Sequence, residues 1–451
     1  MNIIIIGNGK VGYALARQLS GEDHALVLID PNPAALRIAN DTLDLLCIEG
    51  SGASIQVLRS AGVAAADLVV AVTGSDELNI VCCLIAKKLG SCRTVARIRN
   101  PEYFKEANLL KNEIGVNLVI NPEYAAAQEI SRLLRLPSAF SVETFARGLV
   151  EMIGFPIAQQ DGLADVPLYE YNRRHNNNLL MCAVIRGEEV IVPNGNFIPR
   201  LGDKAYIIGS HQEVVRFFRS TGRNTESLRS ITVLGGSKIA TYLAWSMEEV
   251  GATVRIVEQD EARCQNLAYK LPNAQIICGD GTDSELIQSE GLFETDALVA
   301  LTNRDEENLL MAMSAQRAGV HKVIAKMTRP NYMDMMRELG VDSVISPKDI
   351  TASQISAYVR SMASSEGSAV EHLYRLLDGA VEAVEFTATD SIQFLNKPLR
   401  QLKLKNGLLV AAIARDGNTI IPDGNTCILA GDRVIVMAKR LFLQNLNDIL
   451  Q

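Results

Sequence analysis

The sequence IIIIGNGKVG at residues 3–12, with a helical run to Leu19 and the apolar run Ala25–Asp30 behind it, decides the fold. It predicts a short buried strand, a glycine turn that opens a helix, and a second strand that ends in a carboxylate. Residues 231–258 repeat this order, with ITVLGGSKIA at 231–240, a helical run to Glu249 and an apolar run that ends at Glu258. Gly235 follows Gly7 at the same interval at which Glu258 follows Asp30. The chain therefore contains the same unit twice.

The first glycine turn has the physical features of a nucleotide site. Gly7 allows a tight turn off the strand, Gly9 leaves room for a pyrophosphate, and Gly12 lets the helix pack close to the sheet. The helix N-terminus offers free N–H groups and a positive dipole end to phosphate. Asp30 can accept hydrogen bonds from both ribose hydroxyls and would repel a 2′-phosphate, which favours NAD(H) or an adenosine phosphate over NADP(H). The expected site residues here are Gly7, Asn8, Gly9, Lys10, Val11, Gly12 and Asp30.

The second glycine turn is a degraded copy. Ser237 and Ala240 replace the second and third glycines, whereas Glu258 keeps the ribose acceptor. Two interpretations stay open, a second nucleotide site of altered affinity and a structural relic. The expected site residues are Gly235, Gly236, Ser237, Lys238, Ile239 and Glu258.

Strands alternate with helical runs in both halves, which predicts parallel sheets with helices on both faces. Ligands of such sheets bind outside the carboxyl ends of the strands. Further strands are expected at Leu43–Ile48, Leu68–Val72 and Thr94–Arg99, and helices at Phe104–Glu113 and Pro122–Leu134. The loops after the strands add Gly50, Thr73, Ser75, Arg97 and Arg99 to the first site and Asp280, Thr302 and Lys326 to the second.

Several of these residues have a structural alternative. Arg97 and Arg99 alternate on one strand, so they could bind phosphate, or they could pair with carboxylates such as Asp76. Asp76, Glu77 and Asn79 are equally well explained as capping residues of the following helix. Glu123 follows Pro122 at a helix start, where an acid is common for the same reason.

A smaller unit follows each Rossmann-like unit. Short apolar runs separated by Asp-Gly and Asn-Gly turns predict a β-rich α+β unit. The expected fold class is α/β, with tandem duplicated Rossmann-like domains at 1–136 and 228–360 and small α+β domains at 137–222 and 369–451. The polar stretches Thr221–Ser230 and Ser361–Ser368 are expected to be linkers.

Composition excludes several classes of protein. The net charge of −8 argues against a nucleic-acid partner, which requires a basic face. The sequence has no apolar run long enough to span a bilayer, so no transmembrane helix is expected. The eight cysteines show no metal-like spacing and fit buried thiols in a reducing cytosol, and no metal site is expected. The five histidines are expected at the surface, and no catalytic motif is present, so neither a catalytic residue nor enzyme activity is expected.

Taken together, the motifs resemble the TrkA family, the regulatory subunits of bacterial Trk potassium uptake systems. The residues that carry the resemblance are GNGKVG at 7–12 with Asp30, AVTGSDELN at 71–79, VARIR at 95–99, GDGT at 279–282, and the Gly-Asp pairs at 202–203 and 431–432. The resemblance covers essentially the whole chain. It implies RCK (KTN) domains that bind NAD(H) and possibly ATP/ADP. It also implies a homotetrameric ring, peripheral on the cytoplasmic face of the membrane, that gates an integral-membrane Trk potassium channel or transporter subunit.

Two other classes stay open from the sequence. One is an NAD-dependent oxidoreductase, for which the small units offer little room for a catalytic domain. The other is a redox-sensing transcription regulator, which would need a basic recognition helix, and none stands out.

Overall fold

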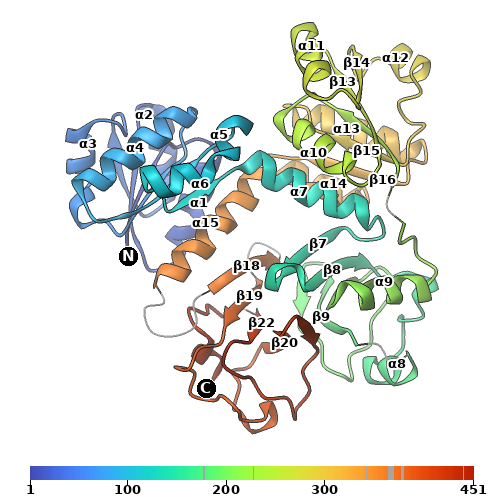
Figure 1. Ribbon diagram of the computed structural model, residues 1–451. Helices are drawn as coiled ribbons and strands as arrows, with labels where there is room; N and C mark the ends of the chain where they lie inside the picture. The colour runs from blue at the N-terminus through green and yellow to red at the C-terminus, as the bar shows by residue number, and fades with distance from the viewer. Residues whose placement is uncertain (176–177, 227, 342, 364–369, 377–379, 440) are drawn as a thin grey trace.

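The computed structural model describes residues 1–175, 178–226, 228–341, 343–363, 370–376, 380–439 and 441–451. Two six-stranded parallel sheets dominate it (Figure 1). The first contains β1 (Asn2–Ile6), β2 (Ala25–Asp30), β3 (Leu46–Glu49), β4 (Leu68–Ala71), β5 (Arg93–Arg97) and β6 (Leu118–Ile120). The second contains β12 (Ser230–Leu234), β13 (Thr253–Glu258), β14 (Gln275–Cys278), β15 (Ala297–Ala300), β16 (Lys322–Lys326) and β17 (Ser343–Ile345). Their strand orders, β3-β2-β1-β4-β5-β6 and β14-β13-β12-β15-β16-β17, are the same and confirm the duplicated Rossmann-like fold.

Helices cover both faces of each sheet. The first sheet is followed along the chain by α1 (Lys10–Ser20), α2 (Pro33–Thr42), α3 (Ile55–Ser60), α4 (Asp76–Leu89), α5 (Pro101–Lys105), α6 (Ala107–Leu109) and α7 (Pro122–Arg135). The second is accompanied by α10 (Lys238–Glu248), α11 (Glu261–Lys270), α12 (Ser284–Ser289), α13 (Asp305–Arg317), α14 (Pro330–Glu338) and α15 (Pro347–Ala363). The central strand β1 is buried on both sides, with every isoleucine from Ile3 to Ile6 at most 1% exposed, which is why it is a continuous apolar run.

Three predicted elements differ from the structure. The expected strand Thr94–Arg99 ends at Arg97, because the Asp76 carboxylate accepts the N–H groups of Arg99 and Asn100 at 2.8 and 2.7 Å and turns the chain away from the sheet. The expected strand Leu43–Ile48 begins only at Leu46, since the Leu43 N–H still bonds the last turn of α2. The expected helix Phe104–Glu113 is broken into α5, α6 and a π-helical turn at Leu110–Ile114.

The last helix of each Rossmann-like unit packs on the other unit. Figure 1 shows α7 running from the first unit to α10 of the second, and α15 running from the second unit to α1 of the first. A serine hydrogen bond lies at the equivalent position of each helix contact, α7 with α10 and α15 with α1. Ser131 and Ser246 are hydrogen-bonded at 2.9 Å, and Ser356 donates to Gln18 at 3.1 Å. The two units are therefore interlocked and not merely joined by a linker.

Each smaller unit is a five-stranded antiparallel sheet. The first comprises β7 (Ser141–Phe145), β8 (Val150–Pro156), β9 (Leu180–Arg186), β10 (Glu189–Ile191) and β11 (Lys204–Gly209), with α8 (Leu168–His175) and α9 (His211–Ser220). The second comprises β18 (Val370–Leu376), β19 (Val381–Thr387), β20 (Leu408–Arg415), β21 (Asn418–Ile420) and β22 (Arg433–Lys439). The strand orders are again equivalent, β10-β9-β11-β8-β7 and β21-β20-β22-β19-β18. One hydrophobic cluster, containing Met152, Ala183, Ala412 and Met437, joins the two sheets.

The Gly-Asp pairs of the smaller units have the same role in both. Asp203 accepts two hydrogen bonds from Arg186, at 2.9 and 2.7 Å. Asp432 accepts two from Arg415, both at 2.7 Å. These bidentate pairs tie the turn before the last strand to the end of a neighbouring strand.

A buried ion cluster joins the first Rossmann-like unit, α15 and the second small unit. Arg360 is 2% exposed, and it donates to Glu22 at 2.8 Å and to Glu382 at 2.7 and 3.1 Å. Arg375 donates to the same two carboxylates at 2.7 and 3.0 Å. His24 Nε2 lies 3.5 Å from Glu22 Oε2 and the His24 side chain is 7% exposed, so the expectation of a surface position was wrong for this histidine.

A large cavity of about 1390 Å³, here called the interdomain chamber, adjoins this cluster. Its walls come from α1, α7, α15 and β18. Glu129 and Glu143 face it, and His372 Nε2 lies 3.7 Å from Glu143 Oε2.

The domain limits stay predictions, since α7 and α15 each serve two units. Residues 364–368 of the expected linker Ser361–Ser368 and Ser227 of the expected linker Thr221–Ser230 lie outside the described residues. Within the described part of the chain, no helix is long and apolar enough to cross a membrane.

Candidate nucleotide-binding sites

In the first glycine turn, two of the three glycines, Gly7 and Gly12, leave no room for a side chain. Gly7 has φ +103°, and a Cβ there would lie 2.9 Å from the Thr73 nitrogen. A Cβ on Gly12 would lie 1.8 Å from the Gly7 carbonyl oxygen, so α1 packs against the turn itself. A Cβ on Gly9 would meet nothing within 4 Å. The space in front of Gly9 is therefore open, where a pyrophosphate would approach the chain.

The start of α1 presents free donors to this space. Its first helical hydrogen bond runs from the Tyr13 N–H to the Gly9 carbonyl at 2.9 Å, so the N–H groups of Lys10, Val11 and Gly12 point out of the helix end. The Ncap is Gly9, which has no side chain to occupy them, and the first turn carries no acid. Such an end favours an anion.

Asp30 lies at the end of β2 beside the turn, as predicted. Its carboxylate accepts the Asn8 N–H at 2.6 Å and the Asn32 N–H at 2.8 Å. The Gly50 N–H donates to the Asp30 carbonyl at 3.1 Å, which places the β3 loop beside it. The carboxylate is thus held in place by backbone donors, and its remaining lone pairs are available to a ribose.

Asn79 holds the loop after β4 against the end of β5. It is fully buried, its Oδ1 accepts from the Thr73 N–H and hydroxyl at 2.8 and 2.7 Å, and its amide donates to the Arg97 carbonyl at 2.8 Å. The capping interpretation of Asn79 was therefore wrong. Ser75 is the Ncap of α4, and its hydroxyl accepts from the Leu78 N–H at 3.2 Å.

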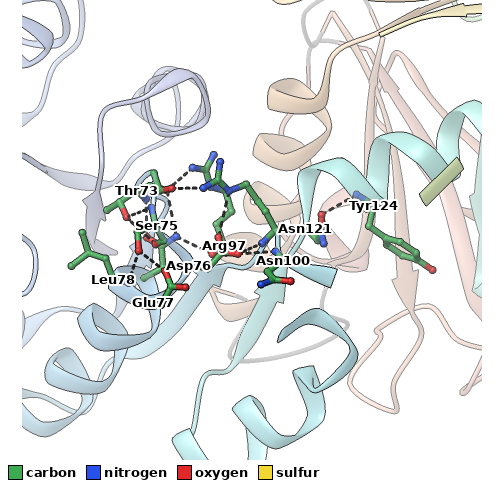
Figure 2. Close-up of polar contacts among 12 residues, drawn as sticks. Thr73, Ser75, Asp76, Glu77, Leu78, Arg97, Asn100, Asn121 and Tyr124 are labelled. Atoms are coloured by element: carbon green, nitrogen blue, oxygen red, sulfur yellow. Dashed lines mark hydrogen bonds and ion pairs between the residues drawn. The ribbon is translucent and has the colours of Figure 1, made fainter. Parts of the chain in front are cut away.

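Both candidate arginines of the first site contact the protein itself. Figure 2 shows Arg97 between the Thr73 loop and the start of α7, with its guanidinium donating to the Thr73 carbonyl. Arg99 pairs with Asp76 at 3.4 Å and donates to the Gly74 carbonyl. For Arg99 the carboxylate alternative is the one observed. Burial, and then the charge of Arg99, lower the pKa of Arg97.

The second unit repeats the bonds of Asn79 and Asp76, although Arg304, at the position of Ser75, makes no side-chain cap. Asn308 accepts from Thr302 at 2.9 and 2.8 Å and donates to the Lys326 carbonyl at 2.9 Å. Asp305 accepts from the Thr328 and Arg329 N–H groups at 3.0 and 2.8 Å. Neither Asn79 nor Asn308 was predicted as part of its site. The asparagine found at equivalent positions of the two repeats was the sequence signal that marks them.

The second glycine turn differs at the helix end. Ser237 takes the position of Gly9 and caps α10, because its hydroxyl accepts from the Ala240 N–H at 3.4 Å. The Glu258 carboxylate contacts the turn and accepts hydrogen bonds from the Gly236 N–H at 2.9 Å and from the Asp260 N–H at 3.0 Å. Part of the anion-binding capacity of this helix end is therefore used by the protein itself.

A cavity of about 140 Å³ lies at this second turn, between Gly236, Glu258, Asp280 and Thr302. Asp280 is exposed and faces its own loop, where it accepts from the Thr282 N–H and hydroxyl at 2.9 and 2.7 Å. These hydrogen bonds lower its pKa. Lys326 donates to the Leu301 carbonyl and to Asn303, both at 3.3 Å.

Charges from the two units meet between the crevices. Burial lowers the pKa of Lys326 to about 8, and the charge of Lys10 from the first unit contributes. Burial raises the pKa of Glu123. The charges of Arg97 and Arg99 of the first unit and of Lys238 of the second unit lower this pKa. Each crevice is therefore within electrostatic reach of the other, which the sequence did not reveal.

The structure brings nearly all predicted site residues to the carboxyl edges of the two sheets. Two of them contribute only backbone, because the side chains of Val11 and Ile239 are 6% and 3% exposed and face the core. Lys10 and Lys238 stand exposed at the helix starts. Among the described residues, no group of three or more His, Cys, Asp or Glu side chains is arranged to hold a metal ion.

This architecture defines a class, the duplicated Rossmann-fold proteins that carry a β-rich unit after each copy. The TrkA-N domain model matches residues 3–122 and 231–347, and the TrkA-C domain model matches 383–448. The chain belongs to the TrkA family, whose members are named as Trk system potassium uptake proteins.

Relatives support this assignment over most of the chain, and solved structures share the fold. A TrkA homologue of Methanosarcina mazei is 33% identical over 430 residues, which cover 94% of each chain. The TrkA protein of Haemophilus influenzae is 31% identical over 93% of this chain and 92% of its own. The GsuK channel bound to NAD shares the fold, with a TM-score of 0.64 at 17% identity over 97% of this chain and 77% of its own. A structure of GsuK bound to ADP matches with a TM-score of 0.51 at 15% identity, over 79% of this chain and 69% of its own.

Proposed function

We propose that this protein is the cytoplasmic, nucleotide-sensing regulatory subunit of a Trk-type potassium transporter, peripheral on the inner face of the membrane and without catalytic activity. The observation that carries the proposal is the open, uncapped start of α1 beside Gly9, with Asp30 at the ribose position. NAD(H), or ATP/ADP, is the ligand class that a ribose-reading acid and a helix N-terminus recognise. Solved structures of the same fold are described as bound to NAD and to ADP.

Coupling between the crevices would transmit binding. The crossing helices α7 and α15 begin close to the crevices, and Glu123 at the start of α7 is reached by charges of both units. A nucleotide that neutralises Lys10 or Arg97 changes the electrostatic balance at these helix starts. The protein would exist in two arrangements of its units, and a nucleotide shifts the equilibrium between them only if it binds one arrangement more tightly than the other.

A homo-oligomer, in the form of a tetrameric ring, is part of the proposal. Val81 and Leu84 on α4 are each 42% exposed, and the equivalent Leu310 and Met313 on α13 are 61% and 37% exposed. Large apolar side chains at equivalent exposed positions of both units suit contacts between copies. Replacement of Leu84 and Met313 by glutamate is expected to lower the mass measured by light scattering, whereas Tyr269→Glu, at an 87% exposed site on α11, leaves it unchanged.

The test exchanges one residue between the two sites. Gly9 has φ −77° and ψ −170°, and Ser237 has φ −76° and ψ 171°, so serine fits at position 9 without strain. Gly9→Ser brings a hydroxyl that caps α1 and competes with phosphate. We expect about tenfold or more loss of affinity for NADH or ADP at the first site, the worth of one hydrogen bond to a charged group. Calorimetry on the full chain measures it.

Ser237→Gly is the matched control, because it opens the second helix end and leaves the first unchanged. Both variants should keep the unfolding midpoint of the unsubstituted protein within a few degrees, since a cap changes stability by only about 1 kcal/mol. Unchanged affinity and stoichiometry in Gly9→Ser would show that the first turn is not a nucleotide site. Potassium flux through the membrane partner, measured with both variants, then reports on gating.

A further inference from the structure

Two cysteines meet directly beside the second crevice. Cys264 lies on α11 and is 7% exposed, whereas Cys278 is the last residue of β14 and is exposed. Cys278 is the register partner of Glu258 in the β13–β14 pair. The Glu258 carbonyl accepts from the Cys264 thiol at 3.1 Å and from the Gly279 N–H at 2.9 Å. The Cys264 thiol and the Cys278–Gly279 peptide therefore meet at one backbone group, the Glu258 carbonyl.

The two thiols also interact with each other. Burial, and then a side-chain hydrogen bond with Cys278, raise the pKa of Cys264. Cys264 on α11 and Cys278 at the end of β14 contact each other across the Glu258 backbone, and a disulfide links cysteines whose side chains already lie beside each other. We propose that Cys264 and Cys278 form a reversible disulfide, which makes the second crevice responsive to the thiol–disulfide state of its surroundings.

The oxidant is the disulfide of a small thiol. The exposed Cys278 thiolate attacks one sulfur of the small disulfide, forms a mixed disulfide and releases one thiolate. Cys264 then gives up its proton, attacks the Cys278 sulfur and expels the second thiolate. The protons of the two cysteines go to the two released thiols, so one small disulfide becomes two thiols as the protein dithiol becomes a disulfide.

Accessibility separates Cys278 from the remaining thiols. Among the eight cysteines, all of which lie in described residues, Cys278 is the exposed one. Burial raises the pKa of Cys82 to about 12, and it also raises the pKa of Cys83 and Cys92. Buried thiols of this kind do not start an exchange with a disulfide in solution, whereas the buried Cys264 needs only to attack a mixed disulfide already formed on Cys278.

The pair belongs to the second unit alone. In the first unit the equivalent positions are Leu36 on α2 and Glu49, the register partner of Asp30. Duplication of the fold therefore does not account for the two cysteines, and oxidation would act on one crevice of the two.

Oxidation would change the second crevice through its walls. Arg263 and Gly279, the neighbours of the two cysteines, both line the cavity, and Arg263 lies 3.8 Å from the Glu258 carboxylate. A disulfide removes the thiol donor from the Glu258 carbonyl and fixes the start of α11 to the end of β14. The consequence for nucleotide binding rests on the proposed function, whereas formation of the disulfide does not.

The experiment uses the full chain in mixtures of reduced and oxidised glutathione, followed by alkylation, proteolysis and mass spectrometry. The unsubstituted protein is expected to yield a linked pair of peptides containing Cys264 and Cys278, lighter by two hydrogen atoms and separated by a reductant. In Cys264→Ser the mixed disulfide cannot resolve, so we expect roughly tenfold more glutathione adduct on Cys278 than in the unsubstituted protein. Cys47→Ser, on β3 of the first unit, is the matched control and should keep the link.

Two results would overturn the proposal. One is that both thiols stay open to alkylation at every glutathione ratio. The other is that glutathione adducts on Cys278 are as abundant in the unsubstituted protein as in Cys264→Ser. Because Cys278 is exposed, Cys278→Ser is expected to fold normally and serves as a second variant in which the linked peptides are absent. None of these readouts requires a bound nucleotide, so failure here and failure of the proposed function are distinguishable.

Discussion

At the scale of single residues, the three glycines of the first turn have different reasons to be glycine. Gly7 is glycine because its φ is positive. Gly12 is glycine because a side chain would collide with the Gly7 carbonyl. Neither reason applies to Gly9. A glycine that no steric contact requires is the one that a ligand explains best. Gly9 is therefore the position at which binding can be changed without changing the fold.

Gly12→Ala tests the steric part of this argument. The new Cβ would lie 1.8 Å from the Gly7 oxygen, so α1 must move, at an expected cost of about 1–3 kcal/mol in the free energy of unfolding. Gly9→Ala, whose Cβ meets nothing within 4 Å, is expected to change it by less than about 1 kcal/mol. Urea unfolding of the two variants measures both. Equal stability of the two would contradict the assigned role of Gly12.

The sequence predicted the turn residues well because their function lies in the backbone and in local spacing. Gly7, Gly9, Gly12 and Asp30 follow a strand–turn–helix–strand pattern that can be read along the chain. The hydrogen bonds of Asn79 cannot be predicted in this way. Its partners are 6 and 18 residues away in the sequence, and the bonds depend on how two loops meet. The same reason explains why Arg99 was placed on a strand and instead pairs with Asp76.

At the scale of elements, helix α7 carries a carboxyl group, that of Glu129, whose pKa the fold raises. Burial, and then the charge of Glu143, raise the pKa of Glu129 to about 8, against a partial opposing effect of Arg132. Between pH 4.5 and pH 8 the unfolded chain loses this proton and the folded chain keeps it. The free energy of unfolding therefore falls across this range.

Glu129→Gln should remove this loss. At pH 8 the variant is expected to be more stable than the unsubstituted protein, by roughly 2 kcal/mol, whereas at pH 4 the two should be equal. Thermal or urea unfolding at the two pH values checks the prediction. A stabilisation of the same size at both would show that packing, and not the proton, is responsible.

The buried ion cluster predicts the opposite dependence at low pH. Burial alone would raise the pKa of Glu22, but hydrogen bonds with His24 and Arg360 and the charges of Arg360 and Arg375 lower it to about 2. The carboxylate therefore stabilises the fold above pH 4.5, and this contribution is lost as the pH falls from 4.5 toward 2.

Glu22→Gln is expected to cost about 3–5 kcal/mol at pH 7, because the buried Arg360 and the partly buried Arg375 lose part of their charge compensation. It should also flatten the decline of stability between pH 4.5 and pH 2. Glu151→Gln is the control. Glu151 pairs at 3.1 Å with His211, whose side chain is 65% exposed, so its loss should cost less than about 1 kcal/mol. Equal costs for the two substitutions would contradict the importance of the cluster.

At the scale of the whole molecule, duplication was evident from the sequence but interlocking was not. Periodic motifs show that a unit recurs, whereas the partner of α7 or α15 depends on how two complete units dock. The polar contacts that fix the docking, such as Asn121 with Tyr242 at 3.0 Å, join residues far apart in the sequence. Such contacts leave no local pattern.

Interlocking predicts that the central linker is dispensable. Residues 1–226 and 228–451, produced together as two polypeptides, are expected to co-purify as one particle, since each crossing helix buries its apolar face in the other half. Residues 1–226 produced alone should aggregate or unfold at lower denaturant concentration. Size-exclusion chromatography with mass spectrometry checks both results. Separate, well-folded halves would contradict the arrangement of α7 and α15.

Fusion of two unlike copies in one polypeptide also has an evolutionary consequence. In a ring assembled from single units, every mutation is inherited by all binding positions together, so none can specialise without the others. Here a change such as serine for glycine at position 237 reaches only alternate positions around any assembly of identical chains. One copy can therefore acquire a new stimulus while its neighbour preserves the old one.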